Sequence, residues 1–452
     1  WLKEARRARP LGPLAPGRPG MAKKRRNANP RDGQGGKRRS TGQRLSARQQ
    51  QVHAVRAALD EGDAGALEEL AFQRHGFCSA DLRRAAWLLL LGLTPGKASS
   101  SSWRASLQDL DRDGKDARVI RVDVQRSVYS WDVHAGMEQA ARDRRRVQLS
   151  ELMHAILNKH SGKLNYFQGF HDIALVFLEV GTPSQAFHMV ERVALFHLSD
   201  QLCWPFERGL LPLLGALFRL LELLDAPLAG ALREADCADV HFAVPWVLTW
   251  FAHSLSRLHD QVMRLYDCLL ASHPTMILYF VAAVLVMHRG TIMATPREMP
   301  EMVMAIQGLP LQSVDADEWA AMARRLAQQV PPDELIARLP LARVRALPPS
   351  CPMLHFPHPW MGRCGGRAGS SREVDVCRLA PCYTGARPRK ASRLWRVLYL
   401  LGLMLRARAR RLPFALLPAE AHHGGPAGKP PWRLLPAIGV GGAAAALLAC
   451  AV

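Results

Sequence analysis

Apolar residues recur at helical spacing over most of the chain, and this pattern constrains the fold more than any other feature. Within residues 139–158, Val147, Leu149, Leu152 and Ile156 fall on or near one face of a helix. We find no run of alternating apolar and polar residues bounded by hairpin turns, which a half-buried strand would require. The sequence therefore predicts an all-α fold. Further helices are expected at 84–92 (closed by Gly92), 172–180, 185–200, 209–224, 244–258 and 260–288, with a loop at 95–102.

The net charge of +21 is carried by the two ends of the chain. Residues 1–50 contain 15 Lys and Arg against 2 Asp and Glu, and residues 342–452 contain 17 against 3, so the middle is mildly acidic. We interpret residues 1–20, ahead of Met21, as upstream sequence translated with the protein. The predicted organisation is a disordered basic segment at 1–50, a helical domain at 60–340, and a flexible linker rich in Pro, Gly and Arg at 341–430.

Residues 434–452 carry no charge and follow Lys429, Trp432 and Arg433. Their length is near the minimum for a helix that spans a bilayer, and the flanking cations and indole fit a membrane interface. We therefore expect a transmembrane tail anchor, with the rest of the chain in the cytosol; a low-complexity apolar tail is the alternative. The shorter apolar run within 392–411 is either an interfacial amphipathic helix or an ordinary basic linker helix.

The nine cysteines do not suggest a metal centre. Those at 351, 364, 377 and 382 are spaced too irregularly for a zinc signature, and the four between 78 and 268 lie in apolar surroundings typical of reduced core thiols. We expect no metal or cofactor of the chain's own. Specific nucleic-acid binding is not expected either, because aromatic residues are sparse in the basic tails and no binding motif is present.

Two short strings carry the residues of clearest chemical interest. The first, Ile120 to Arg126, places an arginine three residues after Asp123, and the second places Gln168 directly before Gly169. A cation for a transferring phosphate and an amide for an attacking water are the two groups needed to complete a slow GTPase. The alternatives are a surface ion pair, worth roughly a few tenths of a kcal/mol, and a turn glutamine that faces water.

These strings resemble signature motifs of the TBC domain, which is found in GTPase-activating proteins for Rab GTPases. The resemblance rests on Leu82-Arg83 to Trp87 and Gly92, on Ile120, Asp123 and Arg126, on Tyr166 and Gln168-Gly169, and on the later stretches Val244–His253, Arg264 to Asp267 and His273-Pro274. The first three motifs occur in the family's order and at compatible spacing. The resemblance covers roughly residues 65–340 and the tail.

The resemblance implies catalytic roles for Arg126 and Gln168, both supplied in trans to GTP held by a Rab. It implies that Asp123 orients Arg126 and that Tyr166 supports the glutamine loop. Gly169 and Ile120 are further supporting positions, and Arg83, Trp87, Arg264 and Asp267 are expected to be structural. His171 is expected to be satisfied by a backbone carbonyl and not to act as a general base, and Asp172 to cap the following helix or complement its dipole.

GTP and Mg²⁺ would arrive with the partner, so the chain would be an activator acting in trans and would need no cofactor. The partner implied is a GTP-bound Rab of the early secretory pathway, and the location implied is the endoplasmic reticulum membrane, with a role in vesicle transport to the Golgi. The alternative is a catalytically inactive Rab-binding scaffold at the membrane. A departure from the family's pattern is the aromatic stretch Val128–Trp131 after Arg126, which bears on which Rab fits.

Overall fold

The computed structural model describes residues 45–107, 116–127 and 134–340, together with 347–348, 351–354, 356–358, Trp360 and Ala380. Every regular element in this part is a helix, so the all-α prediction is confirmed there. Within the same ranges, no helix has both the length and the apolar character needed for a membrane span. Most of the predicted basic N-terminal segment, the aromatics at 128–131, the run at 392–411 and the predicted anchor at 434–452 lie outside the described residues.

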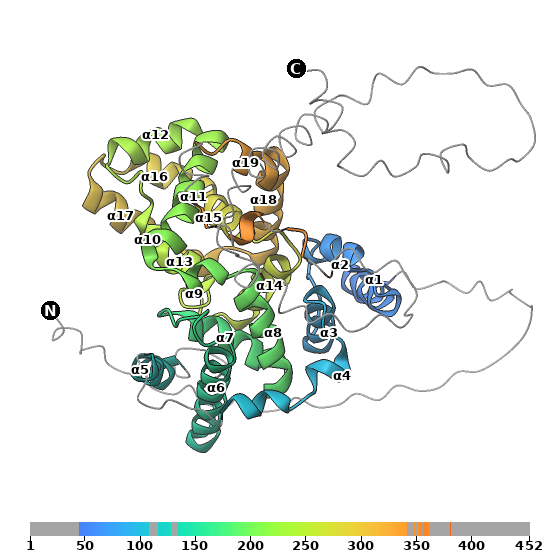
Figure 1. The fold of residues 1–452 in the computed structure, drawn as a ribbon. Helices are drawn as coiled ribbons and strands as arrows, with labels where there is room; N and C mark the ends of the chain where they lie inside the picture. Colours follow the sequence, from blue (N-terminus) through green and yellow to red (C-terminus); the bar gives the residue numbers. More distant parts are fainter. Residues whose placement is uncertain are drawn as a thin grey trace, which may run out of the picture. The chain divides into compact units, whose positions relative to one another are not determined.

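Figure 1 labels the α-helices in chain order. The first eight are α1 (Ala47–Glu61), α2 (Ala64–Ala71), α3 (Ala80–Leu90), α4 (Pro95–Ala98), α5 (Ala117–Ser127), α6 (Gln139–Lys159), α7 (Phe170–Val180) and α8 (Pro183–Phe196). They are followed by α9 (Ser199–Cys203), α10 (Phe206–Gly209), α11 (Leu211–Leu224), α12 (Ala226–Glu234), α13 (Val244–Thr249) and α14 (His259–Leu270). The last are α15 (Met276–Met287), α16 (Arg289–Ala294), α17 (Met299–Gln307), α18 (Ala316–Gln329) and α19 (Pro332–Ala337). Short 3-10 helices are η1 (Ser102–Leu107), η3 (His241–Ala243), η4 (Leu311–Ser313) and η5 (Pro352–Leu354).

Three helices, α5, α6 and α7, pack against one another and support the region of interest (Figure 1). α7 is apolar over almost its whole length and is nearly completely buried, which an all-round hydrophobic helix requires. α5 is amphipathic: it buries Ile120 and Val124 and exposes Val119 and Val122. The start of α7 is therefore fixed by the core, and α5 lies on it as a surface helix.

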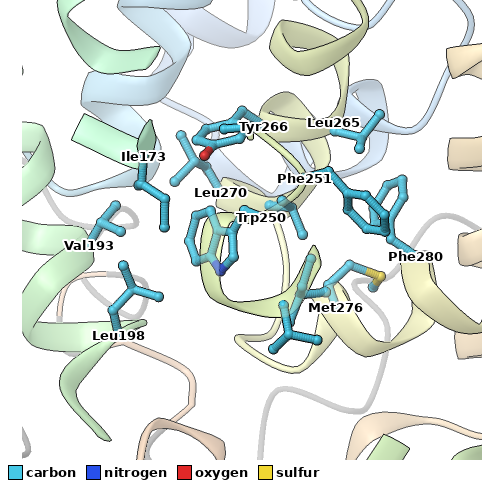
Figure 2. Packing of buried hydrophobic residues seen from close by; sticks show 14 of the residues in the cluster. Ile173, Val193, Leu198, Trp250, Phe251, Leu265, Tyr266, Leu270, Met276 and Phe280 are labelled. Atoms are coloured by element: carbon cyan, nitrogen blue, oxygen red, sulfur yellow. The ribbon is translucent and has the colours of Figure 1, made fainter. Parts of the chain in front are cut away.

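Aromatic rings fill the core around α13, α14, α15 and α18. Figure 2 shows Trp250, Phe251, Tyr266 and Phe280 among buried aliphatic side chains. The ring centroids of Trp250 and Tyr266 are 5.6 Å apart, and those of Phe251 and Trp319 are 4.8 Å apart in an edge-to-face arrangement. These contacts join the segment after α13 to α14 and α18.

The single helix predicted at 244–258 is wrong, because α13 ends at Thr249. Trp250 and Phe251 adopt φ values of 49° and 63°, in the left-handed region that residues with a Cβ avoid at a cost of roughly 1–2 kcal/mol each. Both side chains are buried, and burying a large apolar ring is worth roughly 2–3 kcal/mol. Burial of the two rings thus offsets the strain that ends the helix. Pro245 lies in the first turn of α13, as its fixed φ favours.

Other boundaries also differ from the prediction, and the helix expected at 185–200 is divided into α8 and α9. The helix expected at 260–288 is divided into α14 and α15, because Pro274 disfavours helical geometry at the residue before it. The loop expected at 95–102 contains the one-turn helix α4, whose N-cap Thr94 accepts a hydrogen bond from the backbone of Lys97.

Several described residues within the predicted linker are buried against the helical domain. Leu347, Cys351 and Met353 are almost inaccessible to solvent. The indole Nε1 of Trp360 donates a hydrogen bond to the carbonyl of Leu90 at 2.8 Å, and its ring packs edge-to-face on Phe196 at 4.7 Å. Proline and glycine content indicated flexibility here, but these apolar anchors bind the segment to the core.

Candidate functional site

Arg126 lies in the last turn of α5, and its side chain is 65% exposed. Its Nη2 donates a hydrogen bond to Oδ1 of Asp123 at 2.6 Å, and the Asp123 side chain is only 2% exposed. A charge-assisted hydrogen bond of this kind is stronger than a neutral one. The pair is therefore not the surface ion pair that the sequence left open, because a carboxylate fixed inside the protein holds a guanidinium that projects into solvent.

Tyr166 connects the second string to α5. Its hydroxyl donates to Oδ2 of Asp123 at 2.8 Å, and its backbone N–H donates to Oδ2 of Asp116, just before α5, at 2.9 Å. The backbone N–H of Asn165 donates to the carbonyl of Leu202 at 2.7 Å, which fixes the loop on its other side. Two hydrogen bonds thus hold the loop that carries Gln168 against the helix that carries Arg126.

Gln168 is exposed, and Gly169 directly precedes α7. Gly169 has a φ of 111°, which residues with a Cβ rarely adopt. A Cβ there would also lie 2.9 Å from Cγ2 of Thr249, whose hydroxyl donates to the carbonyl of Pro245 at 2.7 Å and so holds the methyl group in place. Glycine therefore lets the Gln168 loop turn into α7 while passing close to α13.

The network continues from Tyr166 into α7 and beyond. The Tyr166 hydroxyl lies 2.8 Å from Nδ1 of His171, and Nε2 of His171 lies 3.3 Å from Oδ1 of Asp172. The other oxygen of Asp172 lies 3.1 Å from Nδ1 of His253, which is mostly exposed. The expectation that a backbone carbonyl satisfies His171 is wrong, since the side chains of Tyr166 and Asp172 face its two ring nitrogens. Asp172 lies in the first turn of α7, where its charge suits the helix dipole, but it makes no side-chain cap.

Burial and hydrogen bonding set the protonation of this network. Burial, and then the hydrogen bond to Asp123, raise the pKa of Tyr166 well above its ordinary value. Burial lowers the pKa of His171 and outweighs the opposing effect of Asp172 and Asp123. The hydrogen bond with Asp172 raises the pKa of the more exposed His253. Near neutral pH the phenol is therefore protonated and His171 is neutral.

Asp267 forms a second, separate cluster. Its side chain is fully buried and accepts hydrogen bonds from Arg83 Nε at 2.8 Å, Arg83 Nη2 at 3.1 Å and Trp87 Nε1 at 2.9 Å. The backbone N–H of Phe77 adds a fourth at 3.2 Å. These bonds join α3 to α14 and to the segment before α3.

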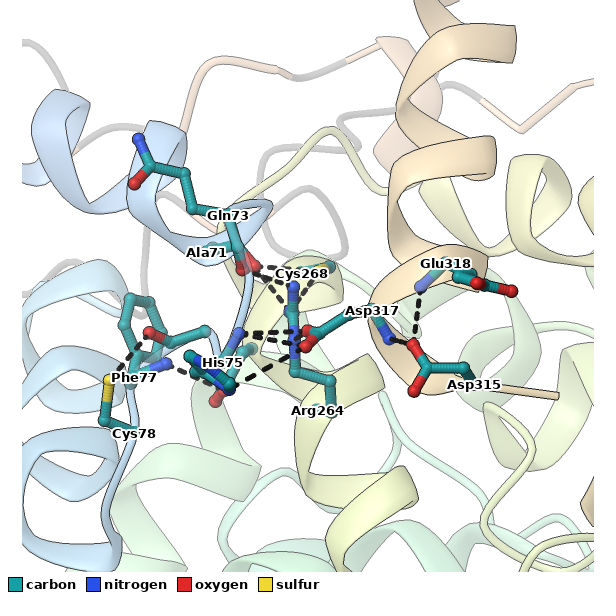
Figure 3. Close-up of polar contacts among 12 residues, drawn as sticks. Ala71, Gln73, His75, Phe77, Cys78, Arg264, Cys268, Asp315, Asp317 and Glu318 are labelled. Atoms are coloured by element: carbon teal, nitrogen blue, oxygen red, sulfur yellow. Dashed lines mark hydrogen bonds and ion pairs between the residues drawn. The ribbon is translucent and has the colours of Figure 1, made fainter. Parts of the chain in front are cut away.

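Arg264 makes a third cluster, drawn in Figure 3. Its Nε lies 2.6 Å from Oδ1 of Asp317 on α18, and its terminal nitrogens donate to the backbone carbonyls of Ala71 and Gln73. Asp317 also accepts the backbone N–H of His75 at 3.1 Å. The four residues that the resemblance marks as structural, including Arg264 and Asp267, thus lie in clusters that join helices.

In the ranges that the structure describes, no group of three or more His, Cys, Asp or Glu side chains is arranged to hold a metal ion. Cys78, Cys203, Cys237, Cys268 and Cys351 are free thiols. The expectation that the chain needs no cofactor of its own stays a prediction.

Sequence reasoning assigned no role to three residues of the site. Asp116 lies 50 residues from its partner Tyr166, and His253 lies 81 residues from Asp172. Thr249 touches Gly169 only because α13 packs on α7. No local spacing marks Asp116, whereas Thr249 and His253 lie in the stretch Val244–His253 on which the resemblance rests, where they were given no role.

Comparison with known proteins gives consistent results. A family model described as the Rab-GTPase-TBC domain matches residues 80–293. The chain is 28% identical over 290 residues to human TBC1 domain family member 20, covering 64% of this chain and 69% of that protein. It is 29% identical over 238 residues to the GTPase-activating protein gyp10 of Schizosaccharomyces pombe, covering 53% of this chain and 61% of that protein. The crystal structure of the Ypt/Rab-GAP domain of Gyp1p has a similar fold, with a TM-score of 0.51, 15% identity, and coverage of 63% of this chain and 99% of that one.

Proposed function

We propose that this chain, whose residues 80–293 match the Rab-GTPase-TBC domain model and which is homologous to TBC1 domain family member 20 and gyp10, accelerates GTP hydrolysis by a Rab GTPase. The observation that carries this proposal is the pair of exposed side chains, Arg126 and Gln168, on elements joined through buried Asp123 and Tyr166. A guanidinium and a carboxamide on neighbouring elements match the two groups that such catalysis requires in trans.

Arg126 would neutralise the negative charge that develops on the phosphate oxygens during transfer of the γ-phosphoryl group. Asp123 would hold the guanidinium in one orientation, so that little reorganisation is needed at the moment of reaction. Gln168 would orient the attacking water. GTP and Mg²⁺ would be carried by the Rab, and the chain's own contribution would be positioning and charge.

A Rab-binding scaffold without catalytic effect is the second candidate. It would need the TBC fold but no particular side chain at 126 or 168. The hydrogen bonds that buried Asp123 accepts from both Arg126 and Tyr166 favour the catalytic proposal, because a binding surface alone does not require a buried carboxylate at this position.

Single-turnover GTP hydrolysis with a panel of Rab GTPases tests the proposal. We expect the wild-type chain to accelerate at least one Rab, and Gln168→Ala to lower that acceleration by at least about tenfold, because the substitution removes a transition-state contact. The control is Gln329→Ala at the exposed end of α18, which should leave the rate unchanged. Binding of a Rab with no acceleration by the wild type would favour the scaffold.

We also propose that residues 434–452 anchor the chain in the endoplasmic reticulum membrane and that the Rab belongs to the early secretory pathway. The support is the uncharged length of this segment and its flanking Lys429, Trp432 and Arg433. Removing everything after residue 430 should release the chain from membranes in cell imaging and fractionation, while solution activity is retained. Unchanged membrane localisation of the shortened chain would contradict the anchor.

A further inference from the structure

The Tyr166 hydroxyl has one proton and two side-chain partners, Asp123 and His171, besides the backbone of Gly169. Its oxygen lies 2.8 Å from Oδ2 of Asp123 and 2.8 Å from Nδ1 of His171. Both distances are those of good hydrogen bonds. A phenol can donate only once, so in one of the two contacts its oxygen must be the acceptor.

The contacts of Asp123 determine which way the Tyr166 O–H points. Its other oxygen accepts the 2.6 Å hydrogen bond from Arg126, and an ionised carboxylate has acceptors only. The Tyr166 proton must therefore point toward Asp123, because two oxygens without a proton between them would repel each other at 2.8 Å. It follows that Nδ1 of His171 carries a proton and donates it to the Tyr166 oxygen.

His171 is itself held from the far side. It lies in the first turn of buried α7 and is only 7% exposed. Its Nε2 faces Asp172, and Asp172 is in turn bound to His253. The imidazole thus has a fixed position between the Tyr166 hydroxyl, to which it is hydrogen-bonded, and the Asp172 carboxylate, which lies 3.3 Å from Nε2.

We propose that His171 is a positioning residue that donates its Nδ1–H to Tyr166, directs the phenolic proton to Asp123, and so holds Arg126 in its working orientation. This proposal rests on the proposed function, in which Arg126 acts on the nucleotide of a Rab. His171 touches neither the Rab nor the nucleotide. Its effect passes through three consecutive hydrogen bonds: His171 to Tyr166, Tyr166 to Asp123, and Arg126 to Asp123.

The protonation of His171 agrees with this geometry. Burial lowers its pKa, so at neutral pH the ring is neutral and only one nitrogen carries a proton. Because the ring has a single proton, the hydrogen bond from His171 to Tyr166 can form only if that proton is on Nδ1.

Three single variants and one double variant of the chain, all in detergent micelles, test the proposal with a Rab that the wild type activates. His171→Leu removes the donor and should lower the maximal single-turnover rate by about tenfold, with the half-saturating concentration changed by less than about threefold, because docking is untouched. His171→Asn places an amide N–H near the position of Nδ1 and should keep the rate within about threefold of the wild type. Tyr166→Phe should match His171→Leu, and the double variant should be no slower than either, because both break the same link.

Combining His171→Leu with Arg126→Ala distinguishes a loss of Arg126 positioning from general structural damage. In the Arg126→Ala background, His171→Leu should change the residual rate by less than about twofold, since there is no guanidinium left to hold. An unchanged tenfold effect in that background, or an asparagine variant as slow as the leucine variant while still folded, would overturn the proposal.

A second readout does not depend on activity. In ¹⁵N spectra of histidine-labelled chain, the His171 ring should show a protonated Nδ1, and Tyr166→Phe should shift that resonance. An unprotonated Nδ1 would overturn the proposal even in an active protein. If the wild type accelerates no Rab, the proposed function fails, and the spectrum alone decides whether His171 donates to Tyr166.

Discussion

Arg126→Ala is expected to lower Rab GTP hydrolysis by at least about tenfold, and by as much as the roughly 10³–10⁵ that an arginine supplied in trans can contribute. The physical reason is that the guanidinium neutralises charge that is larger in the transition state than in bound GTP. The effect should therefore lie in the maximal rate more than in the half-saturating concentration. The measurement is single-turnover hydrolysis at several concentrations of the chain.

Two further variants make this test specific to the guanidinium. Arg126→Lys keeps the charge but loses the planar fork, so we expect only a small part of the rate to return. Arg118→Ala removes an exposed arginine from the same helix and should change the rate by less than about threefold. Thermal unfolding must be similar for all variants; Asp123 still accepts the Tyr166 hydroxyl without Arg126, which limits the loss of stability. A fully active alanine variant would remove Arg126 from the mechanism.

Asp267→Ala is expected to destabilise the helical domain by roughly 3–5 kcal/mol. Four donors converge on this fully buried carboxylate, and the substitution would leave the Arg83 guanidinium without its counter-ion and Trp87 Nε1 without its acceptor. Buried donors that lose their partners cost the full desolvation penalty. Thermal denaturation followed by circular dichroism should show a fall in the midpoint on the order of 10 °C.

Asp260→Ala is the matched control, because Asp260 is on the same helix α14 and its side chain is fully exposed. Its loss should cost less than about 1 kcal/mol, the range for surface charges near a helix N-terminus. Equal stability of the two variants would mean that the cluster of Arg83, Trp87 and Asp267 does not contribute as its geometry indicates.

The positions of most helices could be predicted from the sequence, but helix ends that are set by tertiary packing could not. The helix predicted at 139–158 corresponds to α6, Gln139–Lys159, in which Leu149, Leu152 and Ile156 are buried as expected but Val147 is exposed. The end of α13 at Thr249 escaped prediction because the aromatic residues that follow are forced into left-handed geometry only by burial of their rings. Local propensity does not contain that information, since the partners of those rings come from α14, α15 and α18.

The candidate site, like the fold, could be predicted from the sequence only in part. The two strings drew attention to Asp123, Arg126 and Gln168 but left a surface ion pair and a turn glutamine open, and the resemblance to the TBC domain assigned their roles and that of Tyr166. Sequence reasoning did not indicate that Asp123 is buried, and burial is what distinguishes a held guanidinium from an ordinary surface pair. It also misassigned the partner of His171, because that partner, the Tyr166 hydroxyl, is set by how the loop folds back on α7.

The docking of Trp360 has a practical consequence for protein preparation. A recombinant fragment that stopped at residue 340 would lose the indole that covers Phe196 and satisfies the carbonyl of Leu90. It would expose fresh apolar surface, and such surface promotes self-association. Fragments meant for crystallisation or kinetics should therefore extend past Trp360, so that its side chain still covers the apolar surface of the helical domain.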